Sequence, residues 1–415
     1  MMKEKKPIYL CLAHMSEAAL EKKYINEAID TNWVAPLGPN VNAFEQQLRD
    51  FFGKPVAALA SGTAAVHLAL IAAGVEPGDE VLTQSFTFCA SSHPVSYIGA
   101  TPVFVDSEPD TWNMDPQLLE TAILDRKQKT GQVPKAILPV YLYGMPPKME
   151  EIMAVARKYG IMVIEDAAEG FGSRVDGHIG GTMGEYGILS FNGNKMITTS
   201  GGGALICPSE EARERVTWYA TQAREAYPYY QHEAIGYNYR MSNICAGIGR
   251  GQMTIVRDHI AHHRHVAQLY KEAFANIDGI TFHDELPGME SNFWLSTIML
   301  DEDLKVRNED KAYAQPIRKA VGGAAGVVHG GGNIHTDCEP NRNVEAMRIT
   351  LDMADVESRP LWKPMHKQPV YKNAIAYVNG VSEAIFKRGL CLPSGPMVTD
   401  EQVAYVINTI KSCLD

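Results

Sequence analysis

Short runs of β-forming residues alternate with helical patterns from residue 55 to about residue 207. Asp115-Pro116 is typical of a helix start within this region, and Gly160 of a helix end. Such alternation is typical of a mainly parallel sheet with helices on both faces, so we predict an α/β fold. The predicted strands are VAALA (56–60), EVLTQ (80–84), PVFVD (102–106), KAILPVY (135–141), IMVIED (161–166), GILSF (187–191) and GALIC (203–207).

The pattern changes in the second half of the chain. Residues 208–275 are largely helical, and from about residue 280 the sequence predicts a smaller α+β unit that ends in a helix capped by Thr399. We therefore expect an N-terminal arm and a large domain over residues 1–278. A small C-terminal domain is expected over residues 279–415.

A glycine-rich stretch, GGAAGVVHGGGN (322–333), lies within the expected small domain. Ordering so many glycines costs conformational entropy, so we predict an insertion near residues 322–347. The stretch lacks the Gly-Lys-Ser/Thr ending of a nucleotide-binding phosphate loop, which argues against that function.

The composition is that of an ordinary globular protein. Of 415 residues, 45% are hydrophobic, and 38 Lys and Arg against 49 Asp and Glu give a net charge of −11. This acidic balance argues against a broad nucleic-acid surface but is compatible with a local basic pocket for an anionic substrate. No segment approaches the roughly 18 consecutive apolar residues of a membrane span, and the first residues lack a signal-peptide pattern. We expect a cytoplasmic protein with no nucleic-acid or membrane partner.

The cysteines show no C-x-x-C pair, and an odd number leaves one over from any complete pairing. We therefore expect reduced and mostly buried thiols rather than disulfides. The seven cysteines lie at positions 11, 89, 207, 245, 338, 391 and 413.

Ligands of open α/β sheets gather at the carboxyl ends of the strands, so the residues that follow each strand are candidates for a site. Ser61-Gly62-Thr63-Ala64 follows the first predicted strand and opens a helix. Unpaired backbone N–H groups and the positive end of the helix dipole can hold a phosphate there. The alternative is an ordinary Ser/Thr helix cap with a glycine in the turn.

Glu165 and Asp166 end the strand IMVIED. Because side chains alternate along a strand, the two carboxylates point to opposite faces of the sheet, and only one can easily enter a site. A carboxylate in this position either caps the sheet as an ion-pair partner or is one of the perturbed acids that concentrate in clefts.

Lys195 follows the strand GILSF within SFNGNK, flanked by Asn and Gly, and precedes a triple glycine that allows close backbone approach. Most lysines are solvated surface charges, but a desolvated lysine can form a Schiff base. Together, the phosphate cradle, the carboxylate and the lysine are what pyridoxal 5′-phosphate requires. The helix N-terminus would hold its phosphate, the acid its pyridine nitrogen and the amine its aldehyde.

Five motifs of the large domain resemble those of the DegT/DnrJ/EryC1/StrS sugar aminotransferases, a family of fold-type-I pyridoxal-phosphate enzymes. The resemblance implies a mainly parallel sheet between helices and a smaller α+β domain. The motifs are ASGTAAVHLAL (60–70), SFTFCAS (85–91), IEDAAEGFGS (164–173), SFNGNKMITTSGGG (190–203) and GYNYRMSNICA (236–246).

Within the family, the resemblance is to the 4-aminotransferases that make the UDP-N-acetylbacillosamine precursor. The segment around residues 305–350 looks longer than in those relatives. The supporting segments are NWVAPLGPNV (32–41), YATQARE (219–225), FWLST (293–297), SRPLWKPMH (358–366) and CLPSG (391–395).

The resemblance implies Lys195 and Asp166 as the catalytic residues, the first as Schiff-base lysine and the second as partner of the pyridine nitrogen. Phe88 would stack on the cofactor ring, although a buried aromatic is usually a core residue. Asn238 would reach the phosphate from a second subunit. The expected cofactor-binding residues are Gly62, Thr63, Ala64, Phe88, Asp166, Glu169, Ser190, Lys195 and Asn238. The expected substrate-binding residues are Asn194, Arg240, Trp362 and His366.

The resemblance further implies transfer of an amino group from glutamate to C4 of a nucleotide-linked 4-keto-6-deoxy sugar, first of all UDP-2-acetamido-2,6-dideoxy-4-keto-hexose. The expected partners are this keto-sugar, glutamate and 2-oxoglutarate, and a second copy in a homodimer with shared active sites. The alternatives are a GDP-perosamine synthase-type 4-aminotransferase and a non-catalytic regulator that binds pyridoxal phosphate. Some relatives replace the lysine with histidine and eliminate a hydroxyl, and Lys195 argues against that chemistry here.

Two groups of residues suggest a metal without completing a shell. His259 and His263 are four residues apart on a predicted helix, near His262 and His265, a spacing known from zinc sites. No adjacent carboxylate or cysteine joins them, so we predict no metal and a solvated helix face instead. The second group, which is equally weak, is His329, His335, Asp337 and Cys338.

Overall fold

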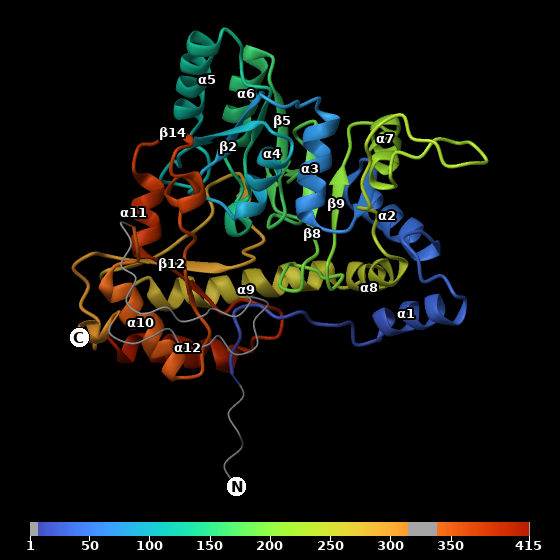
Figure 1. Cartoon of the computed structure of the whole chain (residues 1–415). Helices are drawn as coiled ribbons and strands as arrows, with labels where there is room; N and C mark the ends of the chain where they lie inside the picture. Colours follow the sequence, from blue (N-terminus) through green and yellow to red (C-terminus); the bar gives the residue numbers. More distant parts are fainter. Residues whose placement is uncertain (1–6, 314–337, 415) are drawn as a thin grey trace.

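The computed structural model describes residues 7–313 and 338–414. The glycine-rich stretch 322–333 and the candidate ligands His329, His335 and Asp337 therefore lie outside the described residues. Figure 1 shows a large sheet between helices, with the C-terminal part of the chain (residues 279–313 and 338–414) packed beside and below it.

An eight-stranded sheet forms the centre of the molecule, in the order β1-β9-β8-β5-β4-β2-β3-β14. The strands from β8 to β14 run parallel to their neighbours, while β9 is antiparallel to both β1 and β8. The predicted mainly parallel sheet is thus confirmed. Its strands are β1 (Val56–Leu59), β2 (Glu80–Gln84), β3 (Thr101–Val105), β4 (Ala136–Leu138), β5 (Met162–Asp166), β8 (Tyr186–Ser190), β9 (Gly203–Ile206) and β14 (Ile375–Tyr377).

Alternate side chains of the strands build an apolar layer on each face of the sheet, as the period of two along a strand requires. In β1, Val56 and Ala58 belong to one layer, while Ala57 and Leu59 belong to the other. The first layer contains residues of α2 (Pro39–Phe52), α5 (Pro116–Thr130) and α6 (Met149–Tyr159). The second contains residues of α3 (Gly62–Ala72), α4 (His93–Tyr97) and α7 (Glu210–Ala220).

The C-terminal part has its own antiparallel sheet, in the order β10-β12-β15-β13, and an apolar core that also includes Ile8 and residues from the segment 266–274. The helix α12 (Asp400–Ser412) begins with the predicted cap at Thr399, which forms a capping box with Gln402. The other elements are β10 (Ile280–Phe282), β12 (Ser296–Leu300), β13 (Arg359–Pro360), β15 (Gly389–Leu392), α10 (Arg342–Met353) and α11 (Val381–Arg388). A small third sheet is formed by β6 (Arg174–Val175), β7 (His178–Ile179) and β11 (Met289–Glu290).

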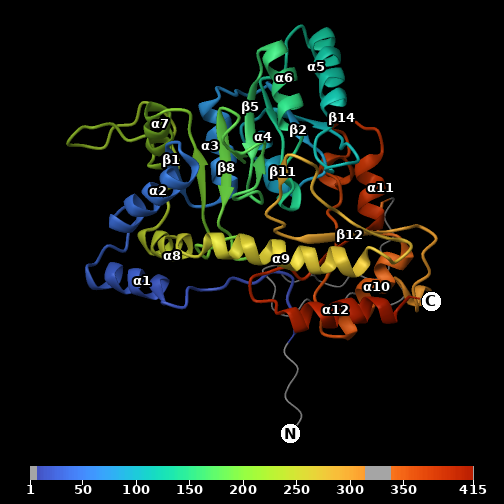
Figure 2. The same cartoon turned by 180° about the vertical axis from the view of Figure 1, so that it is seen from behind.

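The two parts of the chain are closely joined. The long helix α9 (Val256–Phe274) runs below the large sheet and along the C-terminal part, continuing the line of α8 (Asn243–Met253), with α1 (Leu20–Asp30) below them (Figure 2). The strand β14 comes from the C-terminal part and pairs with β3 of the large sheet. The domain boundary near residue 279 stays a prediction.

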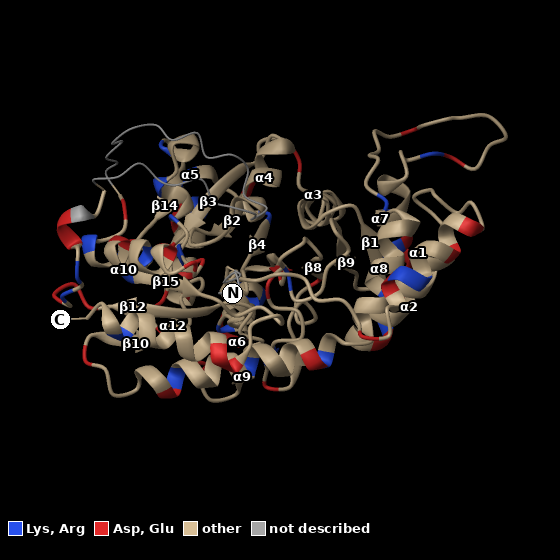
Figure 3. Ribbon diagram, turned by 90° about the horizontal axis from the view of Figure 1, so that it is seen from below, with Lys and Arg blue, Asp and Glu red and all other residues tan. Residues whose placement is uncertain are grey.

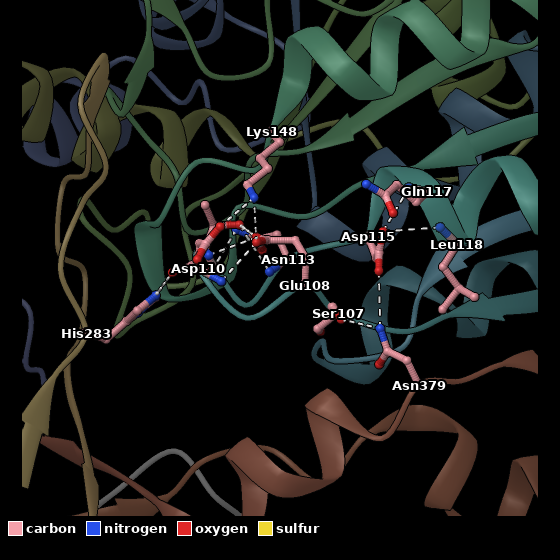
Figure 4. Close-up of polar contacts among 11 residues, drawn as sticks. Ser107, Glu108, Asp110, Asn113, Asp115, Gln117, Leu118, Lys148, His283 and Asn379 are labelled. Carbon is pink, nitrogen blue, oxygen red and sulfur yellow. Dashed lines mark hydrogen bonds and ion pairs between the residues drawn. The ribbon is translucent and has the colours of Figure 1, made fainter.

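A junction of polar contacts (Figure 4) and one aromatic stack also links the two parts. His283 follows β10, and its Nε2 lies 3.3 Å from the carbonyl oxygen of Asp110 in the large part. The imidazole stacks on Trp112 with ring centroids 3.6 Å apart. Burial lowers the pKa of His283 to about 4. Nearby, the buried Glu108 forms an ion pair with Lys148 at 2.9 Å.

The histidines of α9 do not form a solvated face, and that expectation was wrong for two of them. His259 and His263 are buried, with Nδ1 atoms 3.0 Å and 3.2 Å from the carbonyl oxygens of Met196 and Phe293. The reason is that α9 lies between the two parts of the chain. Acidic and basic residues are interspersed along the helix (Figure 3). The exposed His265 pairs with Asp400.

Within residues 7–313 and 338–414, no group of three or more His, Cys, Asp or Glu side chains is arranged to hold a metal ion. Five of the seven cysteines are buried, Cys338 among them, which confirms the expectation of mostly buried thiols. None of the helices in the described part of the chain is long and apolar enough to span a membrane.

Candidate active site

A cavity of about 340 Å³ opens at the carboxyl ends of the parallel strands. Its walls come from the segments that follow β1, β2, β5 and β8, together with Trp294 and Trp362 from the C-terminal part. This is the edge of the sheet at which ligands gather in open α/β folds. The predicted residues Asp166 and Lys195 both line the cavity.

One end of the cavity is the N-terminus of α3. Ser61 caps this helix by accepting a hydrogen bond from the backbone N–H of Ala64 at 3.0 Å, which confirms the cap. The first N–H groups of a helix have no partner within it and can bind an anion. A Cβ at position 62 would lie only 3.1 Å from the Cβ of Ser190, so glycine allows the start of α3 to pack closely against Ser190.

The two carboxylates at the end of β5 face opposite ways, as the alternation predicted. Glu165 accepts hydrogen bonds from three backbone N–H groups and from the hydroxyl of Tyr141, at 2.6 Å, outside the cavity. Asp166 faces the cavity and accepts hydrogen bonds from the Ser91 hydroxyl at 2.6 Å and from the backbone N–H of Ala168 at 3.1 Å. Only Asp166 is therefore available to a ligand.

Lys195 points into the same cavity and is largely buried. Its Nζ lies 3.0 Å from Oε1 of Glu169 and 4.0 Å from the centroid of the Trp294 ring. The other oxygen of Glu169 accepts a hydrogen bond from the backbone N–H of Tyr143 at 2.8 Å. The Trp294 indole N–H donates to the carbonyl oxygen of Asn194 at 2.6 Å. The amine is thus held between a carboxylate and an aromatic face.

Burial raises the pKa of both cavity acids. For Asp166, desolvation is opposed by the hydrogen bonds from Ser91 and Ala168 and by the charge of Lys195. For Glu169, desolvation is opposed mainly by the charge and hydrogen bond of Lys195. Perturbed acids beside a buried amine are typical of a catalytic centre.

The geometry agrees with the comparisons to known proteins. The model of the DegT/DnrJ/EryC1/StrS aminotransferase family matches residues 15–325 and 332–411. The chain belongs to this family. It is therefore a sugar aminotransferase that depends on pyridoxal phosphate.

Relatives of the family match over almost the whole chain. EpsN of Bacillus subtilis strain 168, named as a pyridoxal phosphate-dependent aminotransferase, is 43% identical over 98% of this chain and 95% of its own length. The GDP-perosamine synthase of Escherichia coli O157:H7 is 33% identical, with 97% and 98% of the two chains covered. The crystal structure of a family aminotransferase from Brucella abortus superposes with a TM-score of 0.81 at 27% identity, covering 95% of both chains.

The residues of the cavity fit the cofactor of this family. An anion site at the start of α3, the acid Asp166 and the amine of Lys195 are the three groups that pyridoxal phosphate requires. The start of α3 also packs closely against residue 203, where a Cβ would lie 2.4 Å from the backbone nitrogen of Gly62.

The structure brings most of the predicted site residues to this cavity. Phe88 is among them and is 52% exposed, so its ring is a cavity wall rather than part of the core. Its ring centroid lies 5.4 Å from that of Trp362. The predicted residues that line the cavity are Gly62, Thr63, Phe88, Asp166, Glu169, Ser190, Asn194, Lys195 and Trp362.

Four predicted site residues lie outside the cavity walls. Ala64 is buried in the first turn of α3. The Oδ1 of Asn238 accepts a hydrogen bond from Gln222 at 3.3 Å. Arg240 forms an ion pair with Glu45. His366 lies between two side chains, with Nδ1 2.7 Å from the hydroxyl of Ser85 and Nε2 3.2 Å from Oε1 of Glu383.

Some residues of the site were missed in the sequence. Thr87, Ser91 and Trp294 line the cavity beside Asp166 and Lys195. The signal was present, because Thr87 and Ser91 lie in the motif SFTFCAS and Trp294 in FWLST. A motif alone, however, does not tell which of its residues faces a ligand.

Proposed function

We propose that this sugar aminotransferase moves an amino group from glutamate to C4 of a nucleotide-linked 4-keto-6-deoxy sugar, in the first place UDP-2-acetamido-2,6-dideoxy-4-keto-hexose. The observation that carries the proposal is that Lys195, Asp166 and the N-terminus of α3 share one cavity. A second cavity, of about 370 Å³, shares Phe88 and Trp362 with the first and includes Lys363. A substrate with a bulky anionic nucleotide end would thus have room beyond the reacting centre.

Each residue then has a task that its position suits. Pyridoxal phosphate, when bound, supplies an electron sink that stabilises negative charge on the reacting carbon. Lys195 would bind the cofactor aldehyde and, once free, carry a proton to and from the α-carbon of the amino donor. Asp166 would keep the pyridine nitrogen protonated. Glu169 would hold the free amine of Lys195 inside the cavity, and the start of α3 would bind the phosphate.

The replacement Lys195→Ala tests the central assignment. It should abolish the absorbance band of the covalently bound cofactor and lower turnover by at least about 10²- to 10⁴-fold, the usual contribution of proton transfer alone. Lys129→Ala is the control, because Lys129 is an exposed lysine paired with Asp125. Wild-type turnover or an unchanged band in Lys195→Ala would show that another residue binds the cofactor.

The match to GDP-perosamine synthase favours a second candidate substrate, GDP-4-keto-6-deoxymannose. The nucleotide of the substrate can be tested directly. The enzyme is incubated with glutamate and each of the two keto-sugars, and kcat/KM is compared. We expect the UDP-linked sugar to be preferred, and the opposite ratio would favour the perosamine-forming activity. If no amino donor changes the cofactor spectrum, the non-catalytic regulator is favoured instead.

We also propose a homodimer in which Asn238 serves the active site of the second subunit. Two observations support this. Asn238 lies outside its own cavity, and the loop before it extends away from the body of the molecule beside α7 (Figure 1). In this loop Tyr229, Tyr230 and Ile235 are exposed by 63%, 80% and 83%. Mixing Lys195→Ala with Asn238→Ala should restore activity in mixed dimers, since one site then has both residues. Lack of complementation would contradict shared sites.

A further inference from the structure

Two buried hydroxyl groups lie next to the Asp166 carboxylate. The hydroxyl of Ser91 donates to Oδ2 of Asp166 at 2.6 Å, and the hydroxyls of Thr87 and Ser91 lie 2.8 Å apart. The side chains are almost completely shielded from solvent: Thr87 is 0% exposed, Ser91 2% and Asp166 4%. Both hydroxyl residues belong to the segment that follows β2, whereas Asp166 ends β5.

The direction of these hydrogen bonds follows from counting protons. A serine hydroxyl has one proton and two lone pairs. The proton of Ser91 is used by Asp166, so the contact with Thr87 requires Thr87 to donate and Ser91 to accept. Thr87, Ser91 and Asp166 therefore form a chain in which every O–H points toward the carboxylate, and such chains strengthen their members.

We propose that Ser91, oriented by Thr87, is a positioning residue that holds the Asp166 carboxylate in place and ionised for the pyridine nitrogen of the cofactor. The inference rests on the proposed role of Asp166 and adds residues that act through it.

Ser91 is an important source of stabilisation for the negative charge of Asp166. Burial raises the pKa of Asp166, and the hydrogen bond from Ser91 is the largest of the effects that oppose this rise. Two other charged groups face Asp166, Lys195 and Glu169, and they are paired with each other at 3.0 Å. Glu165, its neighbour in β5, lies on the opposite face of the strand and has its own donors.

The matched pair Ser91→Ala and Ser92→Ala tests the proposal. Ser92 is equally buried, but its hydroxyl donates to the carbonyl oxygen of Cys89 at 3.3 Å rather than to Asp166. The readout is the dissociation constant of pyridoxal phosphate from the full-length protein, measured by absorbance across a range of pH. A thermal melt of each variant confirms that it is folded.

Ser91→Ala should weaken cofactor binding about tenfold, the effect of losing one hydrogen bond to a charged group. As the pH is lowered, this variant should also lose cofactor binding at a pH about one unit higher than the wild type does. The reason is that the pKa of Asp166 rises when Ser91 no longer opposes the effect of desolvation. Thr87→Val leaves the bond between Ser91 and Asp166 in place, so it should shift both quantities in the same direction by less. Ser92→Ala should shift neither.

Asp166→Asn separates failure of this inference from failure of the proposed function. If Asp166→Asn leaves cofactor affinity unchanged, the role of Asp166 is wrong. If Asp166→Asn weakens binding but Ser91→Ala behaves like Ser92→Ala, the role of Ser91 is wrong. The double variant Ser91→Ala/Asp166→Asn should bind the cofactor no more weakly than Asp166→Asn alone, since Ser91 acts through the carboxylate. If Ser91→Ala does not fold, the smaller shift expected for Thr87→Val is the deciding result.

Discussion

Trp294 constrains Lys195 in two ways. Its ring face lies 4.0 Å from Nζ, and its indole N–H fixes the backbone carbonyl of the preceding residue, Asn194, at 2.6 Å. The segment that carries Trp294 is itself fixed, because Asn292 donates to the backbone oxygen of Glu169 at 2.7 Å. One segment of the C-terminal part therefore positions both the amine and its carboxylate partner.

At the scale of the residue, we predict that Trp294→Leu lowers kcat by roughly 100-fold, because displacing a catalytic group by about 1 Å costs that much. Trp294→Phe keeps an aromatic face for the amine and loses only the N–H donor, so it should lose only about fivefold, the effect of about 1 kcal/mol. Steady-state kinetics with glutamate would measure both. Equal losses in the two variants would show that the aromatic face is not what positions Lys195.

Some of these residues could be predicted from the sequence and others could not. Asp166 ends a predicted strand and Lys195 follows another, where the local pattern places a side chain at the edge of the sheet. Trp294 and Ser91 depend on how distant segments pack, which no local pattern contains. For Arg240 the motif suggested a substrate contact, which stays a prediction, and the fold pairs this residue with Glu45.

At the scale of the element, β9 and the start of α3 meet backbone against backbone. A Cβ at Gly203 would lie 2.4 Å from both the backbone nitrogen of Gly62 and the carbonyl carbon of Ser61. Gly203→Ala should therefore push α3 away from β9, lower the free energy of unfolding by about 1–3 kcal/mol and weaken cofactor binding. A Cβ at Gly201 meets nothing within 4 Å, so Gly201→Ala is the control for stability. Equal stability of the two variants in chemical denaturation would contradict this.

The predictability of the elements follows their length and pattern. The seven predicted strands all form, because each has a run of apolar or β-branched residues between turns. The strand β14 was not predicted, since Ile375–Tyr377 is short and gains its place only by pairing with β3.

At the scale of the whole molecule, the junction of the two parts should sense pH through His283. Its folded pKa of about 4 is below its ordinary value of 6.5, so between these values the unfolded chain binds a proton that the folded protein does not. The contribution of neutral His283 to the free energy of unfolding is therefore fully present above about pH 6.5 and is lost as the pH falls. The loss reaches about 2 kcal/mol at about pH 5.

His283→Phe keeps an aromatic ring against Trp112 and removes the titrating group. Between about pH 7.5 and about pH 5 it should lose about 2 kcal/mol less stability than the wild type, as measured by denaturant unfolding. Trp112→Phe disturbs the same stack without removing a titrating group. It should therefore lower stability at both pH values and leave the pH dependence of stability as in the wild type. The same dependence in His283→Phe and the wild type would exclude His283 as its source.

The pairing of β14 with β3 has a consequence for how the chain is made. Residues 101–105 leave the ribosome long before residues 375–377, so the central sheet keeps an open edge during most of synthesis. Open edges recruit strands from other chains, which makes the nascent protein prone to aggregation until its last segment arrives. Fragments that stop before residue 375 should accordingly be insoluble even though they contain every side chain of the catalytic cavity.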